Sequence, residues 1–420
     1  MPNEYTSGMI WSHTLPAWQR EYFERVLLDT VRMKSIMVPF CAVKEDFRAK
    51  DTGIMTYSEV YDIEPNYNAL SEQDIWLRGA YLDSRTVTLD MAIYGDTLKF
   101  SDYSEIMTYI NNGDLRGLVR EKIGQSVRDT LDILARNAFL THPHKVYAGG
   151  TRANRAAIAG TDLFHPDLAE LARTHLEEAE VPGVAGNHDG DGQVIACVTT
   201  PRVIHDIRTA AGSNWLEVQQ YAGSAKKFTH EVGMWGGVRF VRTNRLVLPN
   251  AGALEQQTTL AAGTVPGQGA AETVDAVYKV GQPGSVRYVQ VTSAAGFTVG
   301  MRVTIHDQAV GAAVDENDGT QETRRIVAID AGQNRLVLDK PLLKAHNAGA
   351  FLTKALNIHT AIFMGGPAVV YGIAERPTPV IPPKYDDLMM VNRYGWRGFF
   401  KFKMFRPEFI EVHETCATVD

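Results

Sequence analysis

Residues 84–143 decide the fold, and they read SRTVTLDMAIYGDTLKFSDYSEIMTYINNGDLRGLVREKIGQSVRDTLDILARNAFLTHP. The beginning of this stretch alternates apolar residues with other residues, and the apolar ones are Val87, Leu89, Met91 and Ile93. Such alternation predicts one long β-strand, TVTLDMAIYGDTLKF at 86–100, with one apolar face. The segment GIMTYSEVYDI from Gly53 is a candidate partner strand. We therefore predict an unusually large open hairpin over residues 52–103.

The rest of the stretch has the spacing of a long helix. Apolar residues recur every three or four positions between Asp114 and Thr141, namely Leu115, Val119, Ile123, Val127, Leu131, Leu134 and Ala138. This spacing predicts one amphipathic helix, about 40 Å long at 1.5 Å per residue. We expect a rigid axis whose apolar stripe packs along the body of the protein. Four arginines are expected to face solvent or a neighbouring subunit: Arg116, Arg120, Arg128 and Arg136.

The flanking regions complete an α+β body. Residues 1–51 form an N-terminal arm with a short helix over about Trp18–Met37, and residues 104–250 contain the long helix and an alternating section. That section predicts a helix over Pro166–Ala179, a strand over 194–200, a helix after Pro201 and a strand over 237–249. The order lacks the repeated βα units of a doubly wound sheet.

The amino-acid composition changes at residues 251–355. A junction rich in Gly, Ala and Thr comes first, and its Gly263–Gly269 part is expected to be flexible. Six strand signals then follow, separated by turn residues, over residues 276–355. They predict a small all-β barrel inserted into the body. Residues 356–420 return as strands that complete the body, with a Pro-rich link at 375–387 between them.

Composition narrows the class of protein. The chain has 420 residues, 45 % of them hydrophobic, and a net charge of -7, so it is globular and lacks a broadly basic face for nucleic acid. Three widely separated cysteines, Cys41, Cys197 and Cys416, form neither a disulfide framework nor a zinc set. The N-terminus has no signal-peptide pattern, and the longest apolar stretch, from Ala361, is too short to cross a membrane. We expect a soluble protein made in the cytosol.

Motifs for chemistry are weak throughout. Asn187, Asp189 and Asp191 match the start of a calcium loop, but Val198 stands where the bidentate Glu belongs, so a polar turn is favoured. The segment 315–319 is interpreted as a solvated hairpin tip, and His142-Pro143-His144 as a helix exit. Nucleophile elbows, zinc-protease motifs and phosphate loops are missing from the sequence. We predict no catalytic residues, no metal site and no cofactor.

The order of the pieces resembles the major capsid protein of tailed phages, which has the Hong Kong 97-type fold. The resemblance is closest to the branch typified by coliphage N-four. It rests on SRTVTLDMAIYGDTLKFSDYSE before the long helix, on DLAELARTHLEEAEVPG leading to VIACVTTPRVIHDIR, and on GGPAVVYGIA, YGWRGFFKFKMF and FIEVHET near the C-terminus. It covers most of residues 1–250 and 356–420, and the barrel at 251–355 departs from the simplest family pattern.

This resemblance implies a fold and a role. The fold would comprise an N-arm, an E-loop at 52–103, a spine helix, a P-domain and an A-domain, with the inserted barrel on the outer surface. The protein would assemble with itself into hexamers and pentamers of an icosahedral head around double-stranded DNA. The apolar face of the E-loop would serve assembly, and portal, scaffolding and decoration proteins would be further partners. Assembly would take place in the bacterial cytoplasm, and the protein would end in the virion capsid.

Two alternatives remain open at this point. A tail-tube or baseplate component would also carry a β-barrel, but a tube protein should be mostly β and the long helix argues against it. A hydrolase with a β-type binding module would need paired carboxylates, for which Glu177-Glu178 and Asp386-Asp387 are candidates. Adjacent residues do not face each other on a helix, so neither pair meets the geometry of a glycosidase by itself.

Overall fold

The computed structural model describes residues 35–45, 53–61, 63, 81–101, 115–184, 194–217, 228, 230–264, 288–307, 321–340, 342, 344–382 and 391–418. The chain divides into two compact units. Unit 1 comprises Met1–Ala135 and Val369–Phe405, and unit 2 comprises Arg136–Ala368 and Arg406–Asp420. Each unit therefore combines segments that are far apart in the sequence. The helix predicted over Trp18–Met37 lies almost entirely outside the described residues.

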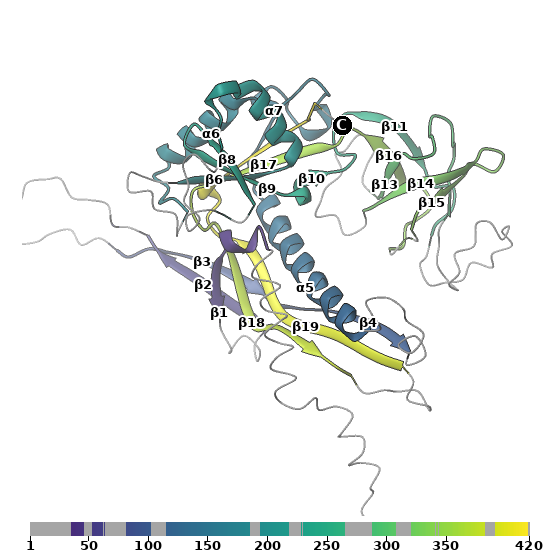
Figure 1. The fold of residues 1–420 in the computed structure, drawn as a ribbon, viewed down its shortest axis with the longest axis horizontal. Helices are drawn as coiled ribbons and strands as arrows, with labels where there is room; N and C mark the ends of the chain where they lie inside the picture. The colour runs from purple at the N-terminus through teal and green to yellow at the C-terminus, as the bar shows by residue number, and fades with distance from the viewer. Residues whose placement is uncertain are drawn as a thin grey trace, which may run out of the picture. The chain divides into compact units, whose positions relative to one another are not determined.

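Unit 1 is built on a four-stranded sheet with the order β1-β18-β19-β4 (Figure 1). Its strands are β1 Ala42–Glu45, β18 Val369–Val380, β19 Val391–Met404 and β4 Ala92–Ser101. β1 runs parallel to β18, and the other neighbours are antiparallel. β4 and β19 pair over the full length of β4, from Ala92 opposite Phe400 to Ser101 opposite Val391.

The predicted long helix is present as α5, Leu115–Leu140, within one residue of the expected ends. The division between the units falls inside it, after Ala135. In unit 1 the helix lies against one face of the sheet, because the Trp396 indole of β19 donates to the Ser126 hydroxyl at 3.4 Å. The aromatic pairs Tyr94–Phe400 and Phe100–Tyr394 stack across β4 and β19.

The other face of the sheet carries a two-stranded hairpin of β2, Ile54–Val60, and β3, Ser84–Asp90. These strands are antiparallel with Met55 opposite Leu89, which confirms the predicted partner of the strand. The expectation of one long strand is wrong, because β3 ends at Asp90 and β4 joins a different sheet. The Met91 N–H donates to the Gly53 carbonyl at 2.9 Å and closes the base of the hairpin. The alternation of apolar residues continues through this change of sheet, so the sequence does not reveal it.

The predicted Pro-rich link is also corrected. β18 continues through Glu375 to Val380 and includes Pro377 and Pro379. Proline lacks the N–H that a ladder needs, and it is tolerated on edge strands. Among the described residues, β1 pairs with β18 only as far as Ile373, so the proline part of β18 has no described partner strand on that side. The register of β18 against β19 shifts twice in this region.

Unit 2 contains an eight-stranded mixed sheet with the main path β5-β20-β17-β6-β9-β8-β7, and β10 pairs with β17. The strands are β5 Lys145–Tyr147, β20 Ile410–Thr415, β17 Ile358–Met364, β6 Ile195–Thr199, β9 Val238–Arg242, β8 Glu231–Trp235, β7 Leu216–Glu217 and β10 Val247–Leu248. The predicted strand over 194–200 and the last predicted strand are thus present. The predicted strand over 237–249 is split into β9 and β10 by a short 3₁₀ helix, Asn244–Leu246.

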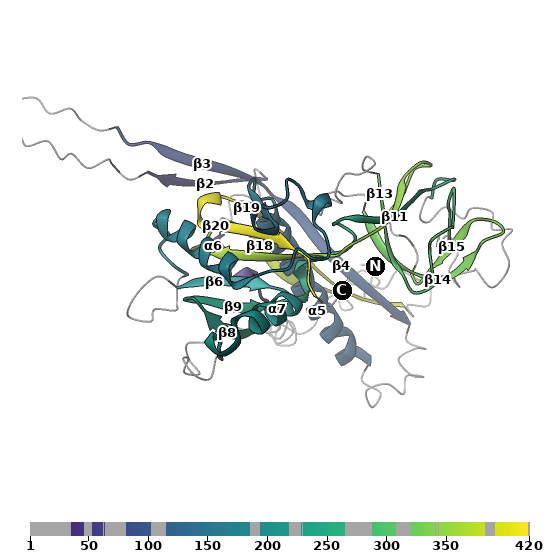
Figure 2. The same ribbon diagram turned by 90° about the horizontal axis from the view of Figure 1, so that it is seen from above.

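Two helices cover one face of this sheet: α6, Pro166–Glu178, and α7, Pro201–Ala211 (Figure 2). Both begin with proline at the first helical position, where its missing N–H costs nothing. Their apolar residues share one buried cluster with the strands, which includes Ala172, Leu176, Val203, Ile207, Cys197, Phe240 and Phe363. Further 3₁₀ helices lie at Val38–Phe40, Ala148–Gly150, Arg155–Ala157, Gly212–Asn214 and Pro407–Phe409.

A second sheet in unit 2 has six strands in the order β11-β16-β13-β14-β15-β12. They are β11 Leu254–Thr259, β16 Phe351–Ala355, β13 Arg302–His306, β14 Glu322–Asp330, β15 Arg335–Leu338 and β12 Tyr288–Gln290. An antiparallel bridge between Leu260 and Val291 joins the two ends of this path, so the sheet closes on itself. We call residues 254–355 the β module.

The β module has its own core and a defined base. Its core includes Val289, Val303, Ile305, Ile326, Leu336, Leu338 and Leu352. At the base, the Gly252 N–H donates to the Leu356 carbonyl at 2.9 Å and the Leu356 N–H donates to the Ala253 carbonyl at 3.1 Å. Strand β11 lies just before the predicted junction, LAAGTVPGQGAAETVD at 260–275, most of which lies outside the described residues, as does the strand predicted at 276–280.

Candidate assembly surfaces

The predicted spine-helix stripe is buried over most of its length. Val119, Ile123, Val127 and Leu131 are buried, and Leu134 is half-buried. The side chain of Leu115 lies outside the described residues. Arg136 departs from the expectation of a solvent-facing row, because its Nη1 donates to the Arg245 carbonyl at 3.0 Å.

A polar chain fixes α5 to the sheet within unit 1. Ser126 on the helix donates from its hydroxyl to the Asp96 carboxylate on β4 at 3.0 Å and accepts from the Trp396 indole. Farther along the helix, the buried Asp132 carboxylate accepts from the backbone N–H of Ile36 at 3.2 Å. This carboxylate holds the segment before the short helix Val38–Phe40. α5 therefore binds both strands β4 and β19 and the segment that leads into β1.

The predicted apolar face of the E-loop does not form one surface. Leu89 is 0 % exposed and packs in a cluster with Met55, Val370 and Phe405 of the same chain. Val87 and Met91 are half-buried against that cluster. Ile93, in contrast, is 76 % exposed on β4. The face that was expected to need a neighbour is thus partly covered by the chain's own sheet, because β3 folds back over β18.

The far end of the hairpin is where apolar side chains stay exposed. We define residues 59–83 as the hairpin tip. Its described apolar residues are exposed: Val60, Tyr61, Ile63, Tyr81 and Leu82. A two-stranded hairpin is marginal in water and lacks a core of its own. Exposed apolar residues concentrated at such a tip are typical of a surface that binds another protein.

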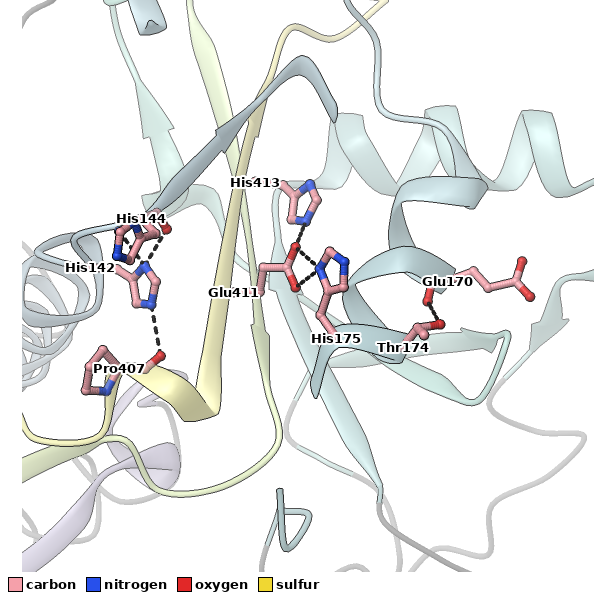
Figure 3. A network of polar contacts seen from close by, with 8 residues as sticks. All are labelled: His142, His144, Glu170, Thr174, His175, Pro407, Glu411 and His413. Atoms are coloured by element: carbon pink, nitrogen blue, oxygen red, sulfur yellow. Dashed lines mark hydrogen bonds and ion pairs between the residues drawn. The ribbon is translucent and has the colours of Figure 1, made fainter. Parts of the chain in front are cut away.

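Unit 2 contains a carboxylate between two imidazoles (Figure 3). Glu411 Oε1 lies 2.8 Å from His413 Nε2, and Glu411 Oε2 lies 3.2 Å from His175 Nδ1 on α6. Burial raises the pKa of Glu411, but the hydrogen bond and charge of His413, aided by His175, outweigh burial and the net pKa is lowered. His413 is completely buried between Phe164 and Phe363. The group ties α6 to β20, with His175 at its exposed end.

A second buried ion pair secures the same strand. Both Glu414 carboxylate oxygens accept from the Arg155 guanidinium at 2.6 Å, and Lys145 Nζ lies 3.7 Å away. Paired, bidentate charges of this kind are tolerated inside a protein because each desolvated group has a partner. Sequence reasoning did not find these partners, since Arg155 and Glu414 are more than 250 residues apart.

A mainly apolar cavity of about 330 Å³ lies in unit 1 between β1, β18 and α5. Cys41, Leu131 and Tyr371 are among its lining residues. Burial, reinforced by the nearby Asp132 charge, raises the pKa of the Cys41 thiol far above its ordinary value. The thiol therefore stays protonated and is a poor nucleophile.

The weak motifs can be followed only in part. The loops at 187–192 and 315–319 lie outside the described residues. His142 and His144 are described. The His142 Nε2 lies 2.9 Å from the Pro407 carbonyl, so the ring links the segment after α5 to the 3₁₀ helix Pro407–Phe409. Within the described part of the chain, no group of three or more His, Cys, Asp or Glu side chains is arranged for a metal ion. No helix among the described residues is long and apolar enough to span a membrane.

Comparison of the sequence with models of protein families identifies the family of the chain. A model of the family described as phage capsid protein matches residues 131–340, which is half of the chain. The chain therefore belongs to the phage capsid protein family. The match continues through most of the β module, so the family pattern does not end at residue 250. Among curated proteins no match was found.

Solved capsid structures have a similar fold. The capsid of Ralstonia phage GP4 is 14 % identical with a TM-score of 0.56, and the alignment covers 92 % of each chain. The cyanophage Pam1 capsid is 11 % identical with a TM-score of 0.49, covering 91 % of this chain and 90 % of that one. The predicted α+β, Hong Kong 97-type capsid fold is confirmed. The protein is therefore a phage capsid protein, a structural component of the capsid.

Proposed function

We propose that many copies of this chain assemble into the hexamers and pentamers of a closed icosahedral shell around double-stranded DNA. The exposed apolar hairpin tip carries this proposal. The base of the hairpin is anchored by Met55 and Leu89, whereas the tip exposes Tyr61, Tyr81 and Leu82. An anchored arm with an apolar end is suited to lie on a second subunit.

The charge of the chain fits an enclosing role. A net charge of -7 limits binding of the shell to DNA, because affinity for phosphates comes mainly from Lys and Arg. The genome would then be held by confinement, as nonspecific cargo. Portal, scaffolding and decoration proteins would be additional partners, and assembly would occur in the host bacterial cytoplasm. The β module would project from the outer surface, since an inward module would occupy space needed for DNA.

The protein would act without catalysis, metal or cofactor. The ionisable groups that come closest to an active site, Glu411, His413 and Glu414, are buried and hold strands and helices together. Cys41 is held as a thiol inside unit 1. These groups support a structural role, which agrees with the membership of the capsid family.

Negative-stain microscopy of the purified, expressed protein tests the proposal. We expect closed shells of uniform diameter. Open tubes would instead support a tail-tube protein, and featureless monomers at high protein concentration would contradict a self-assembling subunit. Size-exclusion chromatography coupled to light scattering measures the same outcome as a mass.

A further inference from the structure

The solvent side of the β module carries basic and apolar residues next to one another. The register of β13 with β14 places Arg302 directly opposite Arg325. The segment just before β13 continues along β14 through two backbone hydrogen bonds with Ile326, both 2.8 Å long. We define the module patch as this arginine pair together with the two valines beside it, Val299 and Val327.

All four residues of the module patch are exposed in the single subunit. Val299 is 62 % exposed and Val327 is 52 % exposed, and both arginines are exposed. The neighbouring Ile326 is buried and belongs to the core of the module, so the patch lies on the outer side of this closed sheet. Apolar side chains that lie together on a surface beside charged ones are typical of a site that binds another protein.

The arginine pair is unfavourable in an isolated subunit, because like charges directly opposite each other on an antiparallel pair destabilise it. The Asp339 carboxylate offsets part of the charge, since it accepts the Arg325 backbone N–H at 3.0 Å. The Arg325 side chain donates from Nε to the Gly300 carbonyl, a neutral group, at 3.2 Å. The module patch therefore fits a partner surface that supplies carboxylates together with an apolar residue.

The exposed side of α6 has that complementary chemistry. Six residues on this side of the helix are exposed, and four of them are carboxylates: Asp167, Glu170, Leu171, Thr174, Glu177 and Glu178. We call these six residues the acidic face. Residues three or four apart on a helix are neighbours, so Leu171, which is 42 % exposed, lies among the carboxylates.

The acidic face is directed away from the polar contacts that hold α6 on its sheet. Figure 3 shows the Glu170 carboxylate on the side of the helix turned away from Glu411 and His413. Glu177 is neutralised locally, because Arg173 Nε lies 2.6 Å from its Oε1. The other three carboxylates are neighbours of like charge on one helix, which is unfavourable unless a cationic surface covers them.

Each subunit thus carries both surfaces and covers neither with the other. The module patch and the acidic face are both exposed in the single subunit, so α6 does not shield the module patch of its own chain. Matched opposite charges steer two surfaces together and fix their register. When two different surfaces of identical subunits meet, the contact passes from copy to copy.

We propose that the module patch of one copy binds the acidic face of α6 on a second copy. The inference rests on the proposed shell assembly and gives the β module a role in it. The partner is a second copy, because the chain itself supplies carboxylates arranged around an exposed leucine. Exposed ion pairs and a few apolar side chains contribute little per contact, so the contact strengthens closed shells, where it is repeated many times, without being required to form them.

Cross-linking in assembled shells tests the contact directly. Val299→Cys and Leu171→Cys in one chain place one new thiol on each surface, and the three native cysteines are buried. Mild oxidation, or a short bismaleimide linker, should give a ladder of linked subunits longer than dimers on a non-reducing gel, because two different surfaces meet. Each single variant is the matched control and should stay monomeric on the gel.

Charge reversal tests the same contact by its strength. Arg302→Glu creates an opposite-charge pair with Arg325, so the isolated subunit should be as stable as the parent or more stable. Its shells should nevertheless dissociate in urea about fivefold faster or more, since a repulsive contact replaces an attractive one. Glu170→Lys should weaken shells in the same way, and the double variant should recover most of the parent half-time. Arg242→Glu, which changes an exposed arginine outside both surfaces, is the control and should behave like the parent.

The outcomes separate the possibilities. Parent-like dissociation of Arg302→Glu shells, or shells of the double-cysteine variant that give no ladder, overturns the proposal. Weaker shells from Arg302→Glu without recovery in the double variant would also overturn it and would assign the module patch to a different protein. If Arg302→Glu lowers the unfolding midpoint of the unassembled subunit, Arg302→Gln is used in its place. Absence of shells from the parent chain would instead refute the proposed function itself.

Discussion

The β module and the β2–β3 hairpin are both made of β-strands, yet they bury their apolar residues in opposite ways. The module closes six strands through the Leu260–Val291 bridge and encloses its own cluster of apolar residues. The hairpin has two strands and packs only its base, through Met55 and Leu89, on another sheet. Its tip keeps Tyr81 and Leu82 exposed. A closed sheet can fold alone, whereas an open pair depends on what it touches.

The difference separates folding from assembly. Apolar burial inside the module contributes to the stability of each subunit, at roughly 25 cal/mol per Å² removed from water. The apolar area of the hairpin tip contributes nothing until a partner covers it. The module is therefore expected to affect the stability of the single subunit, and the tip is expected to affect the formation of shells. The predictions below test that separation.

Removing the hairpin tip should have the largest effect. A chain in which residues 61–82 are replaced by a two-residue Asn-Gly turn keeps strands β2 and β3 and the buried Leu89. We expect a folded, soluble subunit that forms no shells, because the exposed apolar end is gone. Circular dichroism, light scattering and negative-stain microscopy measure fold, mass and shells.

The matched control keeps the tip and removes one exposed apolar residue elsewhere. Val327→Ser changes an exposed residue of the β module and should assemble normally. Normal shells from the tip deletion would show that the tip has no role in assembly.

The stripe of α5 should have the next largest effect, on the stability of unit 1. Leu131 is buried and lines the unit 1 cavity, so Leu131→Ala enlarges that cavity and should cost about 2–5 kcal/mol. Leu131→Asp should cost more, since it buries a charge next to Asp132. Ile133→Ala on the exposed side of the helix is the control and should change stability by less than about 0.5 kcal/mol. Equal urea midpoints for Leu131→Asp and the parent would contradict burial of this stripe.

Local patterns in the sequence were sufficient for the helices. α5, α6 and α7 follow from apolar spacing and from Pro166 and Pro201 at helix starts. α5 and α6 end within one residue of the predicted bounds, and α7 begins at Pro201, where a helix was predicted to start. Strand patterns were less decisive. Apolar residues alternate from Val87 to Ile93 although the chain changes sheets at Met91, because side chains alternate with a period of two in any β-strand. β11 was missed because its residues, LEQQTT, lack the β-branched apolar pattern.

The assembly surfaces depend on pairs that are distant in sequence. Lys99 and Arg393 become neighbours only through the register of β4 with β19, and Leu89 is covered by Val370 and Phe405 from the other end of the chain. The pairing register of two distant strands cannot be predicted from a single sequence. Of the four residues predicted as the apolar face of the E-loop, Leu89 is buried, Val87 and Met91 are half-buried and Ile93 is exposed. Their role in assembly stays a prediction.

A smaller effect is expected from pH, inside the β module. Burial lowers the pKa of His346, and the opposing charges of Glu322 and Asp307 do not restore it; Lys344 lowers it further. Since the unfolded chain then binds a proton more readily than the folded one, stability should fall as pH decreases through about 6.5. His346→Leu should flatten this part of the profile, and the exposed His205→Ala should leave it unchanged. Thermal midpoints between pH 7.5 and 5.5 measure the slope, and an equal slope in His346→Leu would refute the assignment.

The smallest effect on assembly should come from removing the β module itself. Its two ends are joined by the hydrogen bonds between Gly252, Ala253 and Leu356, so a chain lacking residues 254–355 can be closed at that point by a short Asn-Gly turn. The cost falls on Asn250, whose side chain donates to Thr304 and accepts from the Ala355 N–H. We expect shells that still form, with a lower thermal midpoint because the module's contacts with residue 250 and with its neighbours are lost. Thermal scans and negative-stain counts beside the parent measure both quantities. Misfolding of the shortened chain, or loss of shells while the subunit stays folded, would show that the module is part of the assembling body and would remove the contrast with the hairpin.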